Sequence, residues 1–326
     1  MSTSTQPEDF EAVLKGLREA YWEKREGTNL HPPLRRPLID RTVEKVDRYT
    51  FWYEGEEDAV RCLRIYDMPG SLSGNLLRLL QNLPAITTDC EIDGDVIRPL
   101  QNPPPPPEPL SDDSRDVSAE LELLPTISNI GKEHFVKSPK YENEIFNLLK
   151  CQAGKCPGLP LSPNIVQLLG KSNDGKLVFP KYLTPISVVG PVHSICVYKS
   201  WILQLLRGVQ TLHSVGIIHR DLRIDNIVFS QDRETLIICD LESQWGNRAA
   251  PEILHNSKLD AGWTQLSDIW DVGNCIKSLL YGNNPINSVV EWKIPPPFGR
   301  VVEACQRTVP HERAGVEELI EMVESI

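Results

Sequence analysis

The sequence has no apolar run that approaches the roughly 18 residues of a membrane-spanning helix. Its start, MSTSTQPEDFEAV, has neither the basic segment nor the apolar segment of a secretory signal. Basic residues are in the minority, since 34 Lys and Arg stand against 45 Asp and Glu and give a net charge of −11. This balance argues against nucleic acid or an anionic membrane as the main partner. We therefore expect an intracellular protein, cytoplasmic or nuclear, that binds neither nucleic acid nor a membrane.

Cysteine pairs with zinc-type spacing are also missing. Cys151 and Cys156 in CQAGKC have no second Cys/His pair after them, which favours loop thiols over a metal knuckle. Cys196, Cys239 and Cys275 lie in apolar runs, as buried free thiols do. We expect all of them to be reduced thiols.

Proline, by contrast, is abundant and forms one long run. Five successive prolines from Pro103 open the acidic segment NPPPPPEPLSDDSRD, which favours extended polyproline II and cannot bury a core. A stiff spacer is the commoner use of such a tract, and an SH3-type ligand is the alternative. The sequence thus predicts an N-terminal region of unknown function at 1–100, a Pro-rich acidic linker at 101–116 and a second domain at 117–326.

The N-terminal region is expected to contain a helix, two strands and a further helix. Apolar residues share one helical face from Phe10 to Tyr21, with a capping box at Thr5 and Glu8 and a stop at Gly27. The segments RYTFWYEG and AVRCLRIYD predict strands, and SLSGNLLRLLQNLP predicts a Leu-rich helix. None of these segments carries a motif that we can attach to chemistry.

The second domain is predicted to be mostly helical, with one hairpin that gathers polar residues. NIVFS and TLIIC read as two strands joined by QDRE. If Ser230 and Thr235 flank the turn, antiparallel pairing sets Asn226 opposite Cys239 and brings Asp240 out beside Asn226. The open end of the hairpin is therefore where chemistry is expected.

Two carboxylates and one carboxamide converge there, from Asp221, Asn226 and Asp240, with Arg223 between them. Hard oxygen ligands suit Mg²⁺, which accepts one or two carboxylates together with phosphate oxygens. A carboxylate that is not bound to the metal can accept a proton from an attacking hydroxyl. Simple capping of strand ends is the alternative, and the occurrence of all three at this spacing argues against it.

These segments resemble the protein kinase fold. HRDLRIDN, at 219–226, matches the catalytic-loop pattern H-R-D-L-x-x-x-N at every fixed position. SPNIVQLLG, CDLESQWG, APE and SDIWDVG resemble other kinase segments in the right order, from about residue 121 to residue 326. The resemblance implies an α+β, two-lobed fold with a mostly helical large lobe at about 183–326. A reduced small lobe at about 117–182 would precede it, after a small α/β N-terminal region.

The resemblance also implies a role for individual residues, with ATP and Mg²⁺ as cofactors. Asp221 would be the catalytic base, Arg223 the cation near the transferred phosphate, and Asn226 and Asp240 the Mg²⁺ ligands. Structural roles would fall to Asp268 under the catalytic loop, to Glu252 paired with Arg313, and to His219 as a packed core residue.

The small lobe departs from the family pattern. A kinase covers the nucleotide phosphates with G-x-G-x-x-G, and a strand Lys pairs with a helix Glu. Here Gly131 is the single glycine of the candidate phosphate loop, and Lys137 with Glu144 is the candidate pair, only seven residues apart. Either the usual strand is missing and Lys137 is solvated, or a shortened lobe still lets Lys137 reach the phosphates.

The segment after Asp240 departs as well. Leu241 and Glu242 replace the Phe and Gly that usually follow the metal-binding Asp, and Ser243 is the one hydroxyl before Glu252. Activation by phosphorylation of this segment is therefore not expected.

Three functions remain open on these grounds. The first is ATP-dependent, Mg²⁺-assisted phosphoryl transfer to a Ser/Thr hydroxyl, with a protein as substrate or binding partner. The second is a pseudokinase that acts as an interaction or scaffold module. The third is a kinase for a small molecule, against which the HRD and APE motifs count.

Overall fold

The computed structural model describes residues 9–26, 37–45, 48–54, 60–66, 68, 71–73, 76, 88–105, 114–244, 246, 248–254, 261–282 and 293–326. The chain divides into two compact units, and each is described by itself. Unit 1 comprises Met1–Gly16, Asp113–Asn284 and Trp292–Ile326, and unit 2 comprises Leu17–Asp112 and Pro285–Glu291. None of the described helices is both long and apolar enough to cross a membrane.

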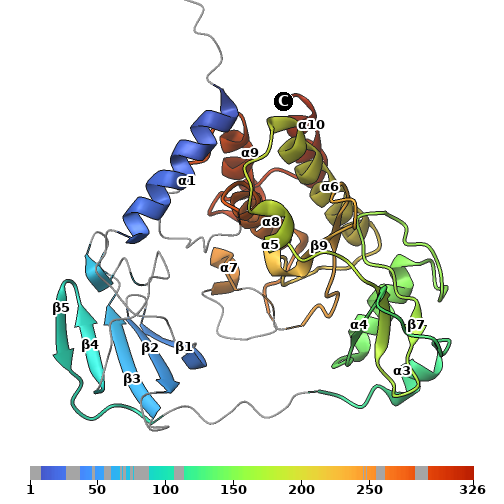
Figure 1. The fold of residues 1–326 in the computed structure, drawn as a ribbon, viewed down its shortest axis with the longest axis horizontal. Coiled ribbons are helices and arrows are strands. Elements are labelled where there is room, and N and C mark those ends of the chain that lie inside the picture. The colour runs from blue at the N-terminus through green and yellow to red at the C-terminus, as the bar shows by residue number, and fades with distance from the viewer. Residues whose placement is uncertain are drawn as a thin grey trace, which may run out of the picture. The chain divides into compact units, whose positions relative to one another are not determined.

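Unit 2 is built on a five-stranded sheet with its strands in chain order (Figure 1). All neighbours are antiparallel except β3 and β4, which run parallel. β2 and β3 confirm the two predicted strands, whereas β1, β4 and β5 were not predicted. β5 is exposed at every position, so no apolar alternation marks it in the sequence. The strands are β1 (Pro37–Lys45), β2 (Arg48–Glu54), β3 (Val60–Tyr66), β4 (Cys90–Asp93) and β5 (Val96–Pro99).

Both faces of this sheet bury apolar side chains, because successive residues of a strand point to opposite faces. Leu63 and Ile65 belong to one cluster, and Cys62, which precedes Leu63 and points to the opposite face, belongs to another with Trp52 and Leu100. The indole Nε1 of Trp52 also donates a hydrogen bond to the carbonyl of Pro104 over 3.1 Å. The first prolines of the Pro-rich tract therefore pack as part of unit 2.

Helix α1 (Phe10–Glu26) confirms the first predicted helix. Its residues up to Gly16 belong to unit 1, where Phe10 packs edge-on against the rings of Tyr198 and Phe298 at 5.9 and 5.6 Å. The predicted capping box and the stop at Gly27 lie outside the described residues. So does most of the predicted Leu-rich helix, of which Leu72, Ser73 and Leu76 are described and helical.

The first part of unit 1 contains a three-stranded antiparallel sheet in the order β6-β8-β7. Its strands are β6 (His134–Lys137), β7 (Gly170–Lys171) and β8 (Leu177–Pro180), and they are accompanied by the helices α3 (Ser118–Glu122) and α4 (Glu142–Cys151). Residues 114–133 are all described and contain no strand before β6, only an isolated bridge from Thr126 to Lys171. The sheet therefore lacks a hairpin ahead of β6.

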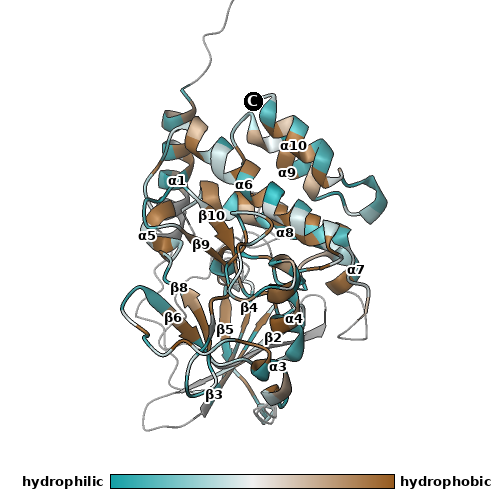
Figure 2. Ribbon diagram, turned by 90° about the vertical axis from the view of Figure 1, so that its right-hand side faces the viewer, coloured by the Kyte–Doolittle hydropathy of each residue, from teal (hydrophilic) through white to brown (hydrophobic). Residues whose placement is uncertain are grey.

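In the remaining described residues of unit 1, the regular structure is helical apart from one short hairpin, β9 (Ile227–Phe229) with β10 (Leu236–Ile238) (Figures 1 and 2). α8 is buried on nearly all sides, as its apolar sequence predicts, and it starts at a capping box between Thr264 and Ser267. Together with the strands, these helices confirm the predicted α+β composition. They are α5 (Ile186–Val189), α6 (Ile195–Ser214), α7 (Pro251–Leu254), α8 (Gln265–Leu280), α9 (Phe298–Cys305) and α10 (Val316–Glu324), with short 3₁₀ turns η2 (Ile224–Asn226) and η3 (Pro310–Glu312).

The cysteine expectations hold only in part. All eight cysteines are free thiols, and Cys275 is buried as expected. Cys196 is exposed, because it lies in the first turn of α6, before the buried residues of this helix begin. Cys151 is the buried last residue of α4 and not a loop thiol.

Candidate active site

The β9–β10 hairpin has the predicted register. Phe229 pairs with Leu236, and the backbone N–H of Ser230 donates to the carbonyl of Thr235 over 2.9 Å. At the other end the N–H of Cys239 donates to the carbonyl of Asn226 over 3.0 Å. Asn226 and Cys239 thus lie opposite one another, and Asp240 follows directly at the open end.

Asp221 and Asn226 are joined at this end of the hairpin. The amide Nδ2 of Asn226 donates to the carboxylate Oδ2 of Asp221 and to its backbone carbonyl, both over 2.8 Å. Arg223, whose side chain is half exposed, places its Nε 3.6 Å from the same Oδ2 and 3.9 Å from a carboxylate oxygen of Asp225. Asp221 is therefore oriented by one amide and faces one guanidinium.

Asp268 on α8 holds the loop that carries Asp221 by hydrogen bonds to its backbone. This buried carboxylate accepts hydrogen bonds from the backbone N–H groups of His219 (2.8 Å) and Arg220 (3.0 Å) and lies 2.9 Å from Nε2 of His213. Arg220 has a φ of +69°, a left-handed conformation that is costly for a non-glycine residue. The two backbone bonds to Asp268 stabilise the loop in this conformation.

The other expected structural residues also have the expected partners. Glu252 accepts a bidentate pair of hydrogen bonds from Arg313, at 2.6 and 2.7 Å. His219 is buried, and its Nε2 lies 2.9 Å from the carbonyl of Cys239, so it contacts backbone in the core.

Lys137 is not solvated at a strand end. Its Nζ donates to Glu144 on α4 over 2.8 Å, to Glu242 over 2.7 Å, and to Asp240. The short spacing suffices because Lys137 is the last residue of β6 and Glu144 lies in the first turn of α4, so that residues 138–141 alone connect them. Of the two alternatives left open for Lys137, the solvated lysine is therefore excluded.

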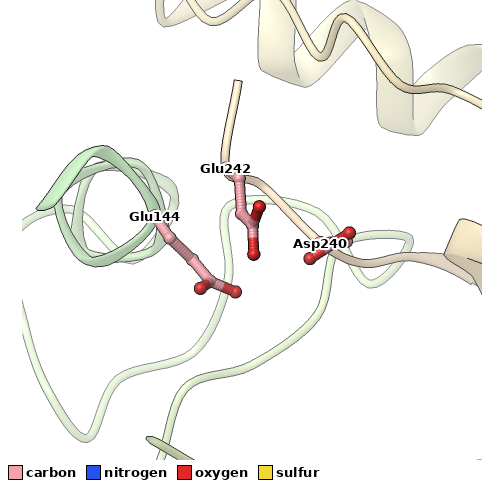
Figure 3. Close-up of side chains that lie close together, drawn as sticks. All are labelled: Glu144, Asp240 and Glu242. Carbon is pink, nitrogen blue, oxygen red and sulfur yellow. The ribbon is translucent and has the colours of Figure 1, made fainter. Parts of the chain in front are cut away.

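The carboxylates of Glu144, Asp240 and Glu242 converge on one point (Figure 3). One oxygen of each lies within 4.8 Å of the others, and Glu144 is 2% exposed. Burial lowers the pKa of Lys137, but the attraction of Glu144 and Asp240 outweighs that effect and raises the pKa above its usual value. Lys137 is therefore an ammonium at neutral pH.

Glu144 has the opposite balance. Burial, with a smaller contribution from repulsion by Glu242 and Asp240, raises its pKa to about 7 despite the lowering effect of Lys137. Three carboxylates thus share one ammonium, and the cluster has more negative than positive charge.

Gly131 has only local contacts. Its N–H donates to Nδ1 of His134 over 3.1 Å, and its carbonyl accepts from the N–H of the same residue. Together with the lack of a strand before β6, this places Gly131 in a turn and not at the tip of a hairpin. The structure does not bring Gly131 to the other predicted site residues.

Two residues at this site were not predicted. Glu242 was read as the loss of a glycine, although a carboxylate two positions after Asp240 is a visible signal for a second charged contact. Asn147 on α4 gave no signal at all. Its Nδ2 donates to the carbonyl of Leu241 over 2.8 Å and to Oγ of Ser243 over 3.1 Å, so α4 holds the segment after Asp240.

Comparison with known proteins agrees with this geometry. Residues 184–323 match the family model of the protein kinase domain. The chain is 26% identical over 170 residues to a mitogen-activated protein kinase kinase kinase of Drosophila melanogaster, and the match covers 40% of this chain and 14% of that protein. The human and rat proteins named mitogen-activated protein kinase kinase kinase 11 match at the same identity, over 40% of this chain and 20% of theirs.

The chain therefore contains a domain of the protein kinase superfamily. The match spans at most a fifth of the length of these curated relatives. The family match starts at residue 184, after Lys137 and Glu144, so the roles of those two residues rest on their geometry.

Proposed function

We propose that unit 1 is an ATP-dependent kinase that transfers the γ-phosphoryl group to a Ser/Thr hydroxyl with the help of Mg²⁺. The observation that carries the proposal is the position of the Lys137 ammonium, bound to Glu144 on α4 and to Asp240 after β10. A strand lysine paired to a helix glutamate and facing the metal-binding aspartate is the arrangement that kinases use for the nucleotide phosphates.

The donor atoms suit Mg²⁺. Asn226 uses its Nδ2 to bind Asp221, which leaves its carbonyl oxygen for a metal, and Asp240 follows it across the hairpin. One carboxylate and one amide oxygen, completed by phosphate oxygens and water, match the preference of Mg²⁺ for hard ligands. When bound, the metal would neutralise charge on the nucleotide phosphates.

The protein's own residues would do the rest. Asp221, oriented by Asn226, would accept the proton of the attacking hydroxyl. Arg223 would attract the transferred phosphate, and Lys137 would bind the phosphates that stay with the nucleotide. Glu144 and Asp268 would be positioning residues, one for Lys137 and one for the loop of Asp221.

The domain assignment follows from this reading. Residues 117–182, with the three-stranded sheet and α4, would be a reduced small lobe, and residues 183–326 the large lobe. The names of these relatives describe kinases that act on a protein kinase, and on that ground we propose a protein substrate or partner for this chain. Residues 1–100 and the linker at 101–116 would form a separate region with a role of its own.

A pseudokinase is the second candidate, and two observations favour it. No strand lies between residues 114 and 133 to form a phosphate-covering hairpin, and Gly131 has only local contacts. In addition, Glu242 binds the ammonium of Lys137, which the phosphates of a nucleotide would need.

MgATP binding and turnover separate the two. We expect MgATP to raise the thermal midpoint of the full chain, since a ligand at 100 times its Kd stabilises a protein by about 2.7 kcal/mol. We expect Asp221→Asn to keep this shift and to lose ATP-dependent phosphoryl transfer, while the exposed control Glu303→Gln keeps both. Binding without transfer in the wild type would favour the pseudokinase, and no shift at millimolar MgATP would refute the kinase.

A further inference from the structure

The cluster of Glu144, Asp240 and Glu242 has the composition of a cation site. Each of the three residues offers a carboxylate oxygen, and these oxygens lie within 4.8 Å of one another (Figure 3). Oxygens around a single Ca²⁺ at about 2.5 Å can be up to about 5 Å apart, and those around Mg²⁺ somewhat less. Little movement would therefore bring all three onto one ion.

A cation already occupies this point. The ammonium of Lys137 contacts the same three residues. Its single positive charge is opposed by three carboxyl groups, so negative charge is in excess in the cluster. The side chains are mostly shielded from water, so this imbalance is costly.

One oxygen of the cluster also lacks a partner. Oε2 of Glu144 is buried and accepts no hydrogen bond among the described residues, although the residue is 2% exposed. A buried carboxylate oxygen without a donor is unfavourable and points to an absent ligand. Figure 3 shows this carboxylate extending from α4 toward Glu242.

We propose that Glu144, Asp240 and Glu242 form a divalent-cation site that is independent of nucleotide and that the Lys137 ammonium fills in its absence. Glu242 is the ligand that distinguishes this chain, because it stands where the kinase pattern has a glycine. The ion and the ammonium compete for Asp240 and Glu242, whereas Glu144 can offer the ion its unpartnered Oε2 and keep Lys137 on Oε1. Binding of the ion therefore releases Lys137 from Glu242, and in a kinase, as proposed above, this frees the ammonium for phosphate.

The test uses Mn²⁺ alone, without nucleotide, on the full chain, with free Mn²⁺ measured by electron paramagnetic resonance. Lys137→Met removes the competing ammonium, so we expect it to bind one Mn²⁺ at least about tenfold more tightly than the wild type, because affinity follows the charge of the ligand set. Adding Glu242→Gln to that variant should abolish the gain. Adding Glu303→Gln, an exposed change of the same kind on α9, should leave it intact.

Equal Mn²⁺ affinity of Lys137→Met and wild type would overturn the proposal, as would a gain that survives Glu242→Gln. If circular dichroism shows that Lys137→Met does not fold, Glu242→Gln in the wild-type background decides the matter. It should weaken Mn²⁺ binding about tenfold, and an unchanged affinity would refute the site. Because no nucleotide is present, these outcomes are separate from the failure of the proposed kinase activity, which the MgATP experiment reports.

Discussion

Asp268→Asn tests how the loop that carries Asp221 is held. The native carboxylate accepts from the N–H of His219 and of Arg220 through different oxygens. An asparagine keeps one of these oxygens and puts an NH₂ group in place of the other. If the oxygen stays with His219, the NH₂ group faces the N–H of Arg220, and two donors oppose each other.

The expected loss follows from the one bond that cannot form. A hydrogen bond to a charged group contributes about 1.5–3 kcal/mol, so Asp268→Asn should lower the free energy of unfolding by at least that amount. The amide of Arg220 should lose its protection against hydrogen exchange, because Asp268 is its acceptor in the structure. Since Arg220 holds a left-handed backbone next to Asp221, phosphoryl transfer should fall more than MgATP binding.

The assays are equilibrium urea unfolding and hydrogen exchange at the loop. Asp232→Asn is the matched control, because Asp232 is exposed on the β9–β10 turn and an asparagine can still accept from the N–H of Glu234. We expect the control to stay within about 0.5 kcal/mol of wild type. Native protection of the Arg220 amide in Asp268→Asn would refute the role assigned to Asp268.

Two further changes test the packing of unit 1 by urea unfolding. Arg313→Met should cost about 3–5 kcal/mol, because it leaves the Glu252 carboxylate without its buried partner, whereas the exposed Arg307→Met should cost under about 0.5 kcal/mol. Burial raises the pKa of Glu252, but the hydrogen bonds from Arg313 outweigh that and keep the pKa below the usual 4.5. The contribution of the pair to the free energy of unfolding is therefore complete above pH 4.5 and declines as the pH falls through the pKa of the folded state. A cost of Arg313→Met that does not shrink over this pH range would contradict the role of the pair. Gln152→Leu should cost at least about 2 kcal/mol, because the backbone N–H and C=O of Leu168 each lose their side-chain partner, at about 1–3 kcal/mol per group. A cost under about 0.5 kcal/mol would show that water replaces the amide of Gln152.

Local signals in the sequence predicted much of unit 1. The hairpin register followed from two short apolar strands and a polar connection, and α8 followed from an apolar segment of helical length. The bidentate contact of Arg313 with Glu252 came from motif resemblance. Such features depend on residues near in sequence or on a pattern long enough to be distinctive.

Unit 2 was predicted less completely. The strands β2 and β3 have aromatic and β-branched residues on both faces and were found. β4 and β5 are four residues long, and the exposed β5 gains its strand conformation from pairing with β4 alone. Such pairing has no trace in the hydrophobic pattern.

The amino-acid order alone indicated which groups meet at the candidate site, namely a loop with Asp221 and Asn226 and an aspartate after the next strand. It also carried the resemblance of this domain to protein kinases. Only the tertiary structure decided what Lys137 and Glu242 do. The contact between Lys137 and Glu242 joins β6 to a segment more than a hundred residues later in the chain. No local conformational preference specifies a contact between residues so far apart in the sequence. It arises because three carboxylates from two distant segments cannot be buried together without a cation, and the lysine at the end of β6 supplies one.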